Sequence, residues 1–507
     1  MPSDEERPAL DAPDGELIHV KHWRITGNHA FVQTQLVALI QGRAGRDLTI
    51  SQLHSTAAII TNWYRQHGYL LSRAYLPAQE IRDGVVEIAV LEGRLEGIQV
   101  ANTSKVSIEL IDRHVDHLTQ AGAVQGQSLE RSLLLLDDLP GVEVRSTLRP
   151  GASVGTSDLD LRVAGSNRIN GSLDADSFGN RYTGALRAGG TINFNSPFHR
   201  GDLFTVRAST SGSGMRYGRA AWQTPLGGSG LQAGVAWSDL RYELGEDFES
   251  LDAHGTARVG TAWVGYPLLR SQARNVNLRL SYDDKRLVDR TDATSTVTRR
   301  SLDVWTLGVS GDRTDAWGGG GFNTFQIDLT FGQLDLDPRA AALDHAAYGH
   351  RTEGGYSKLA LSFSRLQRLS QRFSLYASLT GQIADKNLDS SETQTLGGFY
   401  GVRAYPQGEA AGADAAILNL ELRWSLPMLP EVQALAFVDA GTVRVNHSPL
   451  LTDRDNSRTI TGEGLGLQWL HGDRFAAKAY AAWRSSAEPT SDEDRNPRFW
   501  VQLAQYF

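Results

Sequence analysis

The chain has 507 residues, including 52 glycines and no cysteine, and carries a formal net charge of −8 at pH 7. This length predicts more than one domain, and the negative charge argues against nucleic acid as a partner. No run of about 18 apolar residues is present, which excludes transmembrane helices but not a membrane β-barrel, whose lipid-facing and lumen-facing residues alternate. The absence of cysteine fits an oxidising compartment, where an unpaired thiol is a liability.

Residues 1–17 are acidic and rich in proline, which predicts a flexible lead-in. From residue 18 the pattern becomes mixed α and β. Residues 18–25 alternate as a strand, residues 31–40 and 51–66 have helical spacing, and residues 72–76 and 85–91 alternate again. Asp47 and Thr49 are candidate caps for the second helix. The sequence therefore predicts a β-α-α-β-β module over residues 18–94.

The same order of elements repeats over residues 95–168. A strand at 95–100 precedes two helices at 106–118 and 128–138, and strands at 142–148 and 158–163 complete the unit. Two consecutive modules with one order of elements indicate a tandem α+β region before the rest of the chain.

Beyond Asn167 helical spacing disappears and alternation continues to the C-terminus. Residues 418–424 are the clearest case, with leucine and tryptophan at the even positions and Asn419, Glu421 and Arg423 at the odd positions. A soluble β-sandwich would alternate as well, so this pattern leaves open which face meets lipid. Short turns are expected at 196–197, 267–268 and 427–430, where proline occurs. The chain ends on Phe507 after an alternating stretch.

Two short motifs stand out within this region. The first is a glycine-rich loop with one arginine, and the second is an alternating stretch in which an acid shares a face with an aromatic residue and a glycine. A guanidinium and a carboxylate form bidentate pairs that fix orientation as well as adding energy. The residues are Gly397, Gly398, Val402, Arg403, Ala404 and Tyr405 in the loop, and Phe437, Asp439 and Gly441 in the strand.

These motifs resemble the loop-six and strand motifs of the outer-membrane transporters of two-partner secretion, the hemolysin-activation/secretion proteins, within the wider superfamily of barrel-assembly proteins. The family loop motif is Val-Arg-Gly-Tyr/Phe, so Ala404 stands where the family has glycine. The two N-terminal modules resemble POTRA domains. That likeness extends to Gly68-Tyr69 and to residues 76–79, 84–86 and 91–94.

The resemblance implies a barrel of 16 antiparallel strands over residues 169–507, about 21 residues per strand and connection, with strands of roughly 9–11 residues. The resemblance also implies that the loop around 397–412 folds inward and that Arg403 and Asp439 lock it. We expect Tyr405 and Phe437 to pack around this pair and Gly441 to make room for it. Phe507, an aromatic residue at the end of an alternating stretch, resembles the assembly signal of bacterial outer-membrane proteins. The start of the chain lacks the basic and apolar regions of a signal peptide, so we expect a mature form with Met1 added and a shortened or absent plug helix.

The implied function is translocation of an unfolded exoprotein with an N-terminal secretion domain across the outer membrane, without ATP or a cofactor. The POTRA modules would bind this cargo in the periplasm. Further expected partners are outer-membrane lipid and, during biogenesis, the barrel-assembly machinery; the transporter itself is expected to be a monomer. The alternatives are an insertase that assembles other barrels and a passive channel.

Four further segments contain residues that occur in catalytic, phosphate-binding or metal sites. Residues 151–155 match G-x-S-x-G, but a nucleophile elbow requires a following helix, and here a strand is expected. The glycines of 462–466 precede no helix, so they do not predict a phosphate site. His19 and His22 differ in strand parity, and residues 453–456 lack the terminal acid of a calcium loop. The sequence predicts neither an enzyme nor a metal site.

Overall fold

The computed structural model describes residues 9–10, 17–120, 122–450 and 455–507. The chain folds into two compact units. Unit 1 comprises Met1–Ser166 with Gly227–Ser229, and unit 2 comprises Asn167–Leu226 with Gly230–Phe507. The predicted lead-in of residues 1–17 lies almost entirely outside the described residues, as do residues 453 and 454 of the segment 453–456.

The first module of unit 1 has a mixed sheet of three strands and a separate pair. In the sheet, β5 lies between β2, which is parallel to it, and β4, which is antiparallel. The prediction of one strand over 18–25 is wrong: Lys21 and His22 both donate their N–H to the carbonyl of Gly84, and the chain changes partner there. The elements are β1 Ile18–Val20, β2 His22–Thr26, α1 Gln33–Ile40, η2 Gln41–Arg43, β3 Arg46–Leu48, α2 Ile50–Gln66, β4 Arg73–Tyr75 and β5 Val85–Leu91, with β1 paired to β3.

Helix α2 carries the core of this module. Thr49 caps it by accepting from the N–H of Gln52, whose side chain accepts from the N–H of Thr49 in turn. On its buried face, the Tyr64 hydroxyl donates to Glu92 Oε1 at 2.7 Å, and burial raises the Tyr64 pKa. A Cβ on Gly93 would lie 2.6 Å from the Leu71 carbonyl oxygen. The segment 91–94 is therefore a structural junction.

The second module has a three-stranded mixed sheet of the same arrangement, in which β8 lies between β6, which is parallel to it, and β7, which is antiparallel. The predicted helix over 106–118 is interrupted at Asp116, whose carbonyl accepts from the hydroxyl of Thr119 at 2.9 Å. Among the described residues, no helix is long and apolar enough to cross a membrane. The elements are β6 Arg94–Asn102, α3 Ile108–Val115, α4 His117–Gln120, α5 Gly126–Asp137, β7 Val142–Pro150 and β8 Thr156–Gly165.

The G-x-S-x-G segment forms the connection between β7 and β8. The Thr156 hydroxyl donates to Glu96 at 2.5 Å, and Ser153 donates its N–H and its hydroxyl to the same carboxyl, each at 3.1 Å. These bonds lower the pKa of Glu96 below its usual range. A strand, β8, follows at Thr156. The serine therefore stabilises a turn between two strands, as the sequence indicated.

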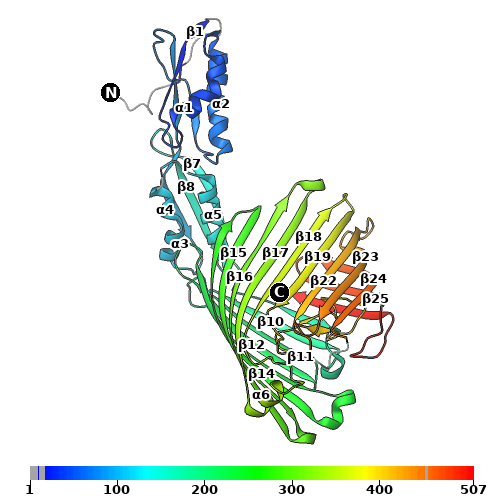
Figure 1. The fold of residues 1–507 in the computed structure, drawn as a ribbon. Coiled ribbons are helices and arrows are strands. Elements are labelled where there is room, and N and C mark those ends of the chain that lie inside the picture. Colours follow the sequence, from blue (N-terminus) through cyan, green and yellow to red (C-terminus); the bar gives the residue numbers. More distant parts are fainter. Residues whose placement is uncertain (1–8, 11–16, 121, 451–454) are drawn as a thin grey trace. The chain divides into compact units, whose positions relative to one another are not determined.

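Unit 2 is a barrel (Figure 1). Within the described residues, 16 antiparallel strands form it, and pairing of β26 with β9 closes it. The first eight are β9 Ile169–Asp176, β10 Arg187–Asn195, β11 Leu203–Thr210, β12 Met215–Pro225, β13 Gln232–Glu243, β14 Ala253–Arg270, β15 Arg274–Thr291 and β16 Thr296–Asp315. The other eight are β17 Gly321–Leu336, β18 Gly354–Arg368, β19 Phe373–Ala384, β22 Asp414–Ser425, β23 Val432–Arg444, β24 Ser457–His471, β25 Phe475–Arg484 and β26 Arg498–Tyr506.

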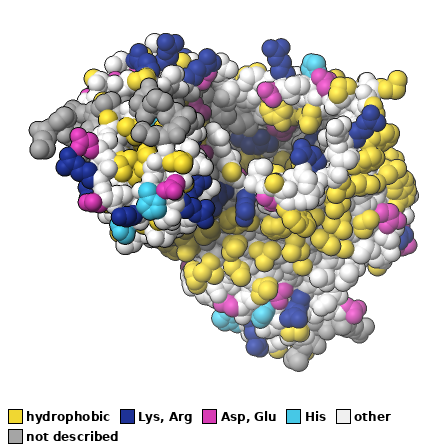
Figure 2. All heavy atoms as spheres, turned by 90° about the horizontal axis from the view of Figure 1, so that it is seen from above, with side chains coloured by type: hydrophobic (Ala, Val, Ile, Leu, Met, Phe, Trp, Pro, Cys, Tyr) yellow, Lys and Arg dark blue, Asp and Glu magenta, His cyan; other side chains and the backbone are white. Residues whose placement is uncertain are grey.

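The structure shows which face of the alternating strands points out of the barrel and which points into it. On β22 the side chains of Leu418, Leu420 and Leu422 are 39–45% exposed on the outer wall, whereas Glu421 is 5% exposed on the inner side. Hydrophobic side chains gather in the same way over the barrel surface in Figure 2. The apolar face of these strands therefore faces outward, as it does in a membrane barrel and not in a soluble sandwich.

Two details of the strands differ from the predictions. The expected turn at 267–268 is wrong, because Pro267 lies within β14 at a register shift between Pro267 and Leu269, where a residue without an N–H is tolerated. The expected strand length is also too short for β14 to β17, which have 16–20 residues. Their ladders continue beyond the apolar band into polar contacts at the loop end.

The connections differ in length at the two ends of the barrel. Short ones, such as 271–273 and 472–474, lie at the end where β9 begins. Residues 196–197 and 427–430 lie in connections at this end, as expected. Long connections lie at the other end and include 337–353, with α6 Pro338–Asp344, and 385–413, with β20 Gln394–Thr395 and β21 Ala411–Gly412. The 3₁₀ turns are η3 Arg181–Thr183, η4 Glu246–Leu251, η5 Asp292–Thr294 and η6 Trp317–Gly319.

Candidate functional site: a loop held against the inner wall

The connection between β19 and β22 has a buried tip. Its neck is the short pair β20 and β21, and its tip runs from residue 396 to 410. Leu396, Val402 and Tyr405 are fully buried, which an exposed surface loop would not achieve. We call residues 396–410 the inward loop. They pack with inner-wall side chains of β22 to β26 in one hydrophobic cluster.

Arg403 binds Asp439 of β23 through three groups. Nε and Nη2 donate to the two carboxylate oxygens at 2.9 and 2.8 Å, and the backbone N–H donates at 3.0 Å. Arg403 is 4% exposed and Asp439 is fully buried. The sequence motifs, 36 positions apart, are thus brought into a bidentate ion pair, the geometry that holds orientation most firmly.

A second acid completes this site. Arg403 Nη1 donates to Glu421 of β22 at 2.6 Å, and Glu421 also binds Arg423 at 2.6 Å. Asn419 donates to Asp439 Oδ1 at 2.8 Å and its Nδ2 also reaches the carbonyl of Gly401. Each of the two buried carboxylates therefore has an arginine directly beside it.

The sequence placed Asn419, Glu421 and Arg423 on one face but did not assign them to the site. In the barrel, Asn419 lies opposite Asp439 and Glu421 lies opposite Phe437. The alternation of side chains on β22 and β23 could have predicted that these residues lie near Asp439. That prediction would have required knowing that the two strands are adjacent in this register.

Aromatic rings enclose the guanidinium. Its Cζ lies 3.6 Å from the centroid of the Phe437 ring and 5.5 Å from that of Tyr480, positions that favour cation–π attraction. Trp500 of β26 donates Nε1–H to the Arg403 carbonyl at 2.7 Å. Phe437 was expected beside the pair. Tyr480 and Trp500 were missed, because no local pattern links them to the motif.

The other motif residues shape the backbone of the loop. Gly398 has φ +114°, and a Cβ on Gly397 would lie 2.4 Å from the carbonyl oxygen of Pro406, so both positions require glycine. A Cβ on Gly441 would lie 3.0 Å from Val402, which means that this glycine makes room for Val402 and not for the ion pair.

Ala404 and Tyr405 have other neighbours than the acid. Ala404 does not adopt a positive φ, so alanine is accommodated at the position of the family glycine. A Cβ on Gly462 would approach the Ala404 methyl at 2.4 Å, and glycine there gives the methyl its space. The Tyr405 hydroxyl binds Ser486 and Ala487, in the connection between β25 and β26.

The inward loop also covers the seam where the barrel closes. Phe399 stacks on Phe178, which follows β9, with centroids 3.8 Å apart and an 8° interplanar angle. Asn180 donates to the Gln407 carbonyl at 2.8 Å. Together with Trp500 of β26, these contacts connect the first and last strands through the loop. At the end of the chain, Phe507 exchanges backbone hydrogen bonds with Gly171 of β9; its role as an assembly signal stays a prediction.

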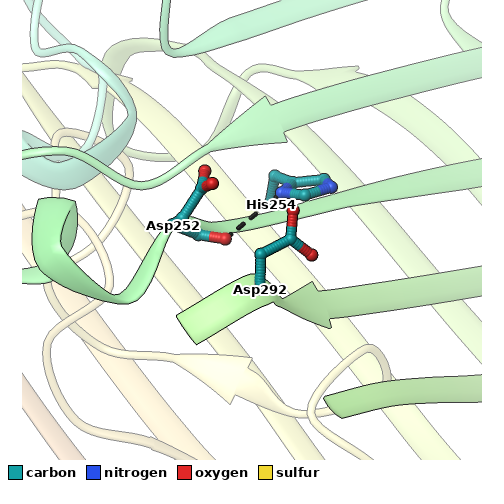
Figure 3. Close-up of side chains that lie close together, drawn as sticks. All are labelled: Asp252, His254 and Asp292. Carbon is teal, nitrogen blue, oxygen red and sulfur yellow. Dashed lines mark hydrogen bonds between the residues drawn. The ribbon is translucent and has the colours of Figure 1, made fainter. Parts of the chain in front are cut away.

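A group of possible metal ligands lies elsewhere on the barrel. Asp252, His254 and Asp292 place one ligand atom each within 4.8 Å of one another, at the loop ends of β14 and β15 (Figure 3). His254 Nδ1 lies 3.3 Å from the Asp252 carbonyl oxygen. Both acids are exposed, and nothing else at this place points to an ion. We assign no ligand to it.

A closed barrel with a buried inward loop, preceded in the chain by two β-α-α-β-β modules, defines the class of outer-membrane barrels with periplasmic POTRA domains. Residues 155–469 match the family Haemolysin secretion/activation protein ShlB/FhaC/HecB, and residues 18–93 match the POTRA domain of ShlB type. The chain belongs to this family. It is a transporter of two-partner secretion, located in the outer membrane with its POTRA modules in the periplasm.

Individual relatives agree over nearly the whole length. The chain is 26% identical to the heme/hemopexin transporter protein HuxB of Haemophilus influenzae, over 95% of this chain and 85% of that one. It is 26% identical to the outer membrane transporter CdiB of Dickeya dadantii, over 91% and 83%. The solved structure of CdiB from Escherichia coli has the same fold, with a TM-score of 0.79 and 22% identity, covering 99% of this chain and 93% of that one.

Proposed function

We propose that this transporter carries one large exoprotein, unfolded, from the POTRA modules through the barrel, and that the inward loop closes the lumen between transport events. The observation that supports this most directly is the buried contact of Arg403 with Asp439 and Glu421. It fixes the loop in place by charge, and charge pairs can be separated and remade without changing the fold.

The two modules, residues 18–94 and 95–168, offer sheet edges for an extended peptide. In the second module β7 is an edge strand, and its residues from Ser146 to Pro150 are exposed. Pairing of cargo with such an edge uses main-chain hydrogen bonds and therefore tolerates many sequences. This suits a cargo that must be held unfolded.

The transport step needs no catalytic group and no cofactor. We propose that folding of the emerged cargo outside the cell removes it from the back-sliding equilibrium and supplies the direction. The barrel would act as a monomer in contact with outer-membrane lipid, after insertion by the barrel-assembly machinery.

The test pairs export with membrane level. Deletion of the gene should abolish secretion of one exoprotein while other outer-membrane proteins keep their amounts, and Arg403→Ala should reduce export more than it reduces the heat-modifiable barrel in the membrane. Loss of many barrel proteins on deletion would instead identify an insertase. Normal export by Arg403→Ala at a normal membrane level would contradict the lock.

A further inference from the structure

The inward loop has a second charged contact beyond Arg403, at Glu409, which is fully buried. Its Oε1 accepts from the N–H and hydroxyl of Thr490 at 2.8 and 3.0 Å, and its Oε2 accepts from the N–H of Ser491 at 2.8 Å and from the Ser491 hydroxyl. Arg458 of β24 forms an ion pair with the same carboxylate. All of these partners lie outside the two sequence motifs.

The partners concentrate on one short stretch of the connection between β25 and β26. Besides Thr490 and Ser491, this stretch binds Tyr405 through the Ala487 carbonyl at 2.6 Å. Arg458 ties it further, donating to the Glu488 carbonyl at 2.8 Å. We call residues 486–491 the latch segment. The inward loop and the latch segment share six hydrogen bonds through two side chains, Tyr405 and Glu409.

A buried carboxylate is tolerated only while its hydrogen-bond partners stay with it. Glu409 has four donors from the latch segment and one cation from the wall. If the inward loop left its place alone, the carboxylate would lose these partners and the N–H groups of Thr490 and Ser491 would be left unpaired. Moving both segments together keeps these donors and breaks the contacts of the wall residue Arg458 with Glu409, Glu488 and Thr490.

The latch segment also has partners on the wall of the barrel. Arg458 donates to the Glu488 carbonyl and to the Thr490 hydroxyl, Thr461 of β24 donates its N–H to the Ser486 hydroxyl at 2.9 Å, and Arg484 of β25 donates to the Ser486 carbonyl at 3.1 Å. Just beyond the segment, Asp492 binds Arg498 of β26 at 3.0 Å. The segment has six hydrogen bonds to the inward loop, and four of them go to one fully buried carboxylate, so these are the bonds whose loss would leave a buried charge without donors.

In the connection between β19 and β22, the residues before the inward loop bind the wall separately. Glu392 binds Lys285 of β15 at 2.6 Å and Lys358 of β18 at 3.0 Å, and Asp389 binds Arg300 of β16 at 2.7 Å. These contacts hold residues 389–392 without involving the inward loop. The tip can thus move while this limb remains in place.

We infer that Glu409 is a second positioning residue of the inward loop, and that the latch segment moves with the loop as one gate. This rests on the proposed function, in which the loop leaves its position during transport.

The test uses pairs of spin labels, which the cysteine-free chain permits without background. One label at Tyr400, which is 76% exposed on the inward loop, is paired with one at Glu488, whose side chain is 74% exposed on the latch segment. A second pair joins Tyr400 to Arg216, an exposed residue of β12, and reports whether the loop has moved. Distance distributions are measured in lipid nanodiscs on the full chain.

Glu409→Gln should broaden the 400–488 distribution at least twofold, and so should Arg458→Gln, which removes the cation from the same carboxylate. Glu493→Gln, in the same connection and with a 60% exposed side chain, is the matched control and should change nothing. A 400–488 distribution in Glu409→Gln and Arg458→Gln no broader than in the control would overturn the anchor.

Arg403→Ala then separates this inference from the lock. We expect the 400–216 distance to shift while the 400–488 distance stays narrow, which supports joint movement. A shift in both distances would overturn joint movement, since the loop would have left the latch behind. A shift in neither would refute the Arg403 lock and joint movement with it, and the Glu409→Gln comparison would still decide the anchor by itself.

Discussion

Replacing Arg403 with alanine tests the reasoning about the ion pair most severely. The change removes three side-chain donors, two to Asp439 and one to Glu421. Glu421 keeps Arg423, and Asp439 keeps Asn419. The ionised Asp439 is therefore the group that the substitution destabilises, because it is fully buried and loses its counter-charge.

The expected magnitude follows from that difference. Breaking a buried pair by removing one partner costs about 3–5 kcal/mol, because the remaining charge is stranded. The surviving contacts of both acids place this case near the lower end, at about 3 kcal/mol. Since each 1.4 kcal/mol is a factor of ten, the fraction of molecules with the loop released should rise roughly 100-fold.

Thiol labelling measures that fraction directly. The sequence has no cysteine, so Val402→Cys introduces a single thiol at a fully buried position of the inward loop. A maleimide reacts with it when the loop is released, and its rate follows the released population. Labelling should be about 100-fold faster with Arg403→Ala than without it.

The control removes an arginine of an exposed ion pair. Arg241, whose side chain is 65% exposed, binds Asp239 at 3.0 Å on the outer side of β13. An exposed pair contributes about 0–1 kcal/mol, so Arg241→Ala should leave labelling nearly unchanged. If Arg403→Ala accelerates labelling no more than Arg241→Ala does, the ion pair does not hold the loop.

Three further outcomes follow from packing and burial. Gly462→Ala should reduce export at a normal membrane level, because its Cβ would lie 2.4 Å from a loop methyl, whereas Gly218→Ala, with nothing within 4 Å, should export normally. Phe178→Ala removes the stack on Phe399 and should lower the barrel's thermal unfolding temperature on heat-modifiability gels, with a loss of about 3–5 kcal/mol; an unchanged temperature would contradict the seam contact. Burial lowers the pKa of the His114 imidazole in α3, so this imidazole binds a proton more readily in the unfolded chain than in the folded one. The stability of the module should therefore fall as pH drops below about 6.5. Hydrogen exchange of α3 should show that fall, and His114→Gln should reduce it.

Much of the molecule could be predicted locally. Alternation on β22 gave the parity of Leu418 and Glu421, and the capping residues gave the start of α2 within one residue. The two motifs gave Arg403 and Asp439, which the structure places in contact. These features depend on neighbours in the chain, where a residue's type and its period are sufficient.

The sequence by itself determined which residues of a strand share a face, the main order of helices and strands in the two modules, and the two partners of the central ion pair. The tertiary structure alone decided which distant residues contact the inward loop. These are Glu421 from the adjacent strand, Trp500 from the last strand, Phe178 after the first strand, and the latch segment around Glu409. The physical reason is that period and parity assign a side chain to a face, whereas strand register and barrel closure choose its neighbours. Those choices depend on the whole ring of strands at once.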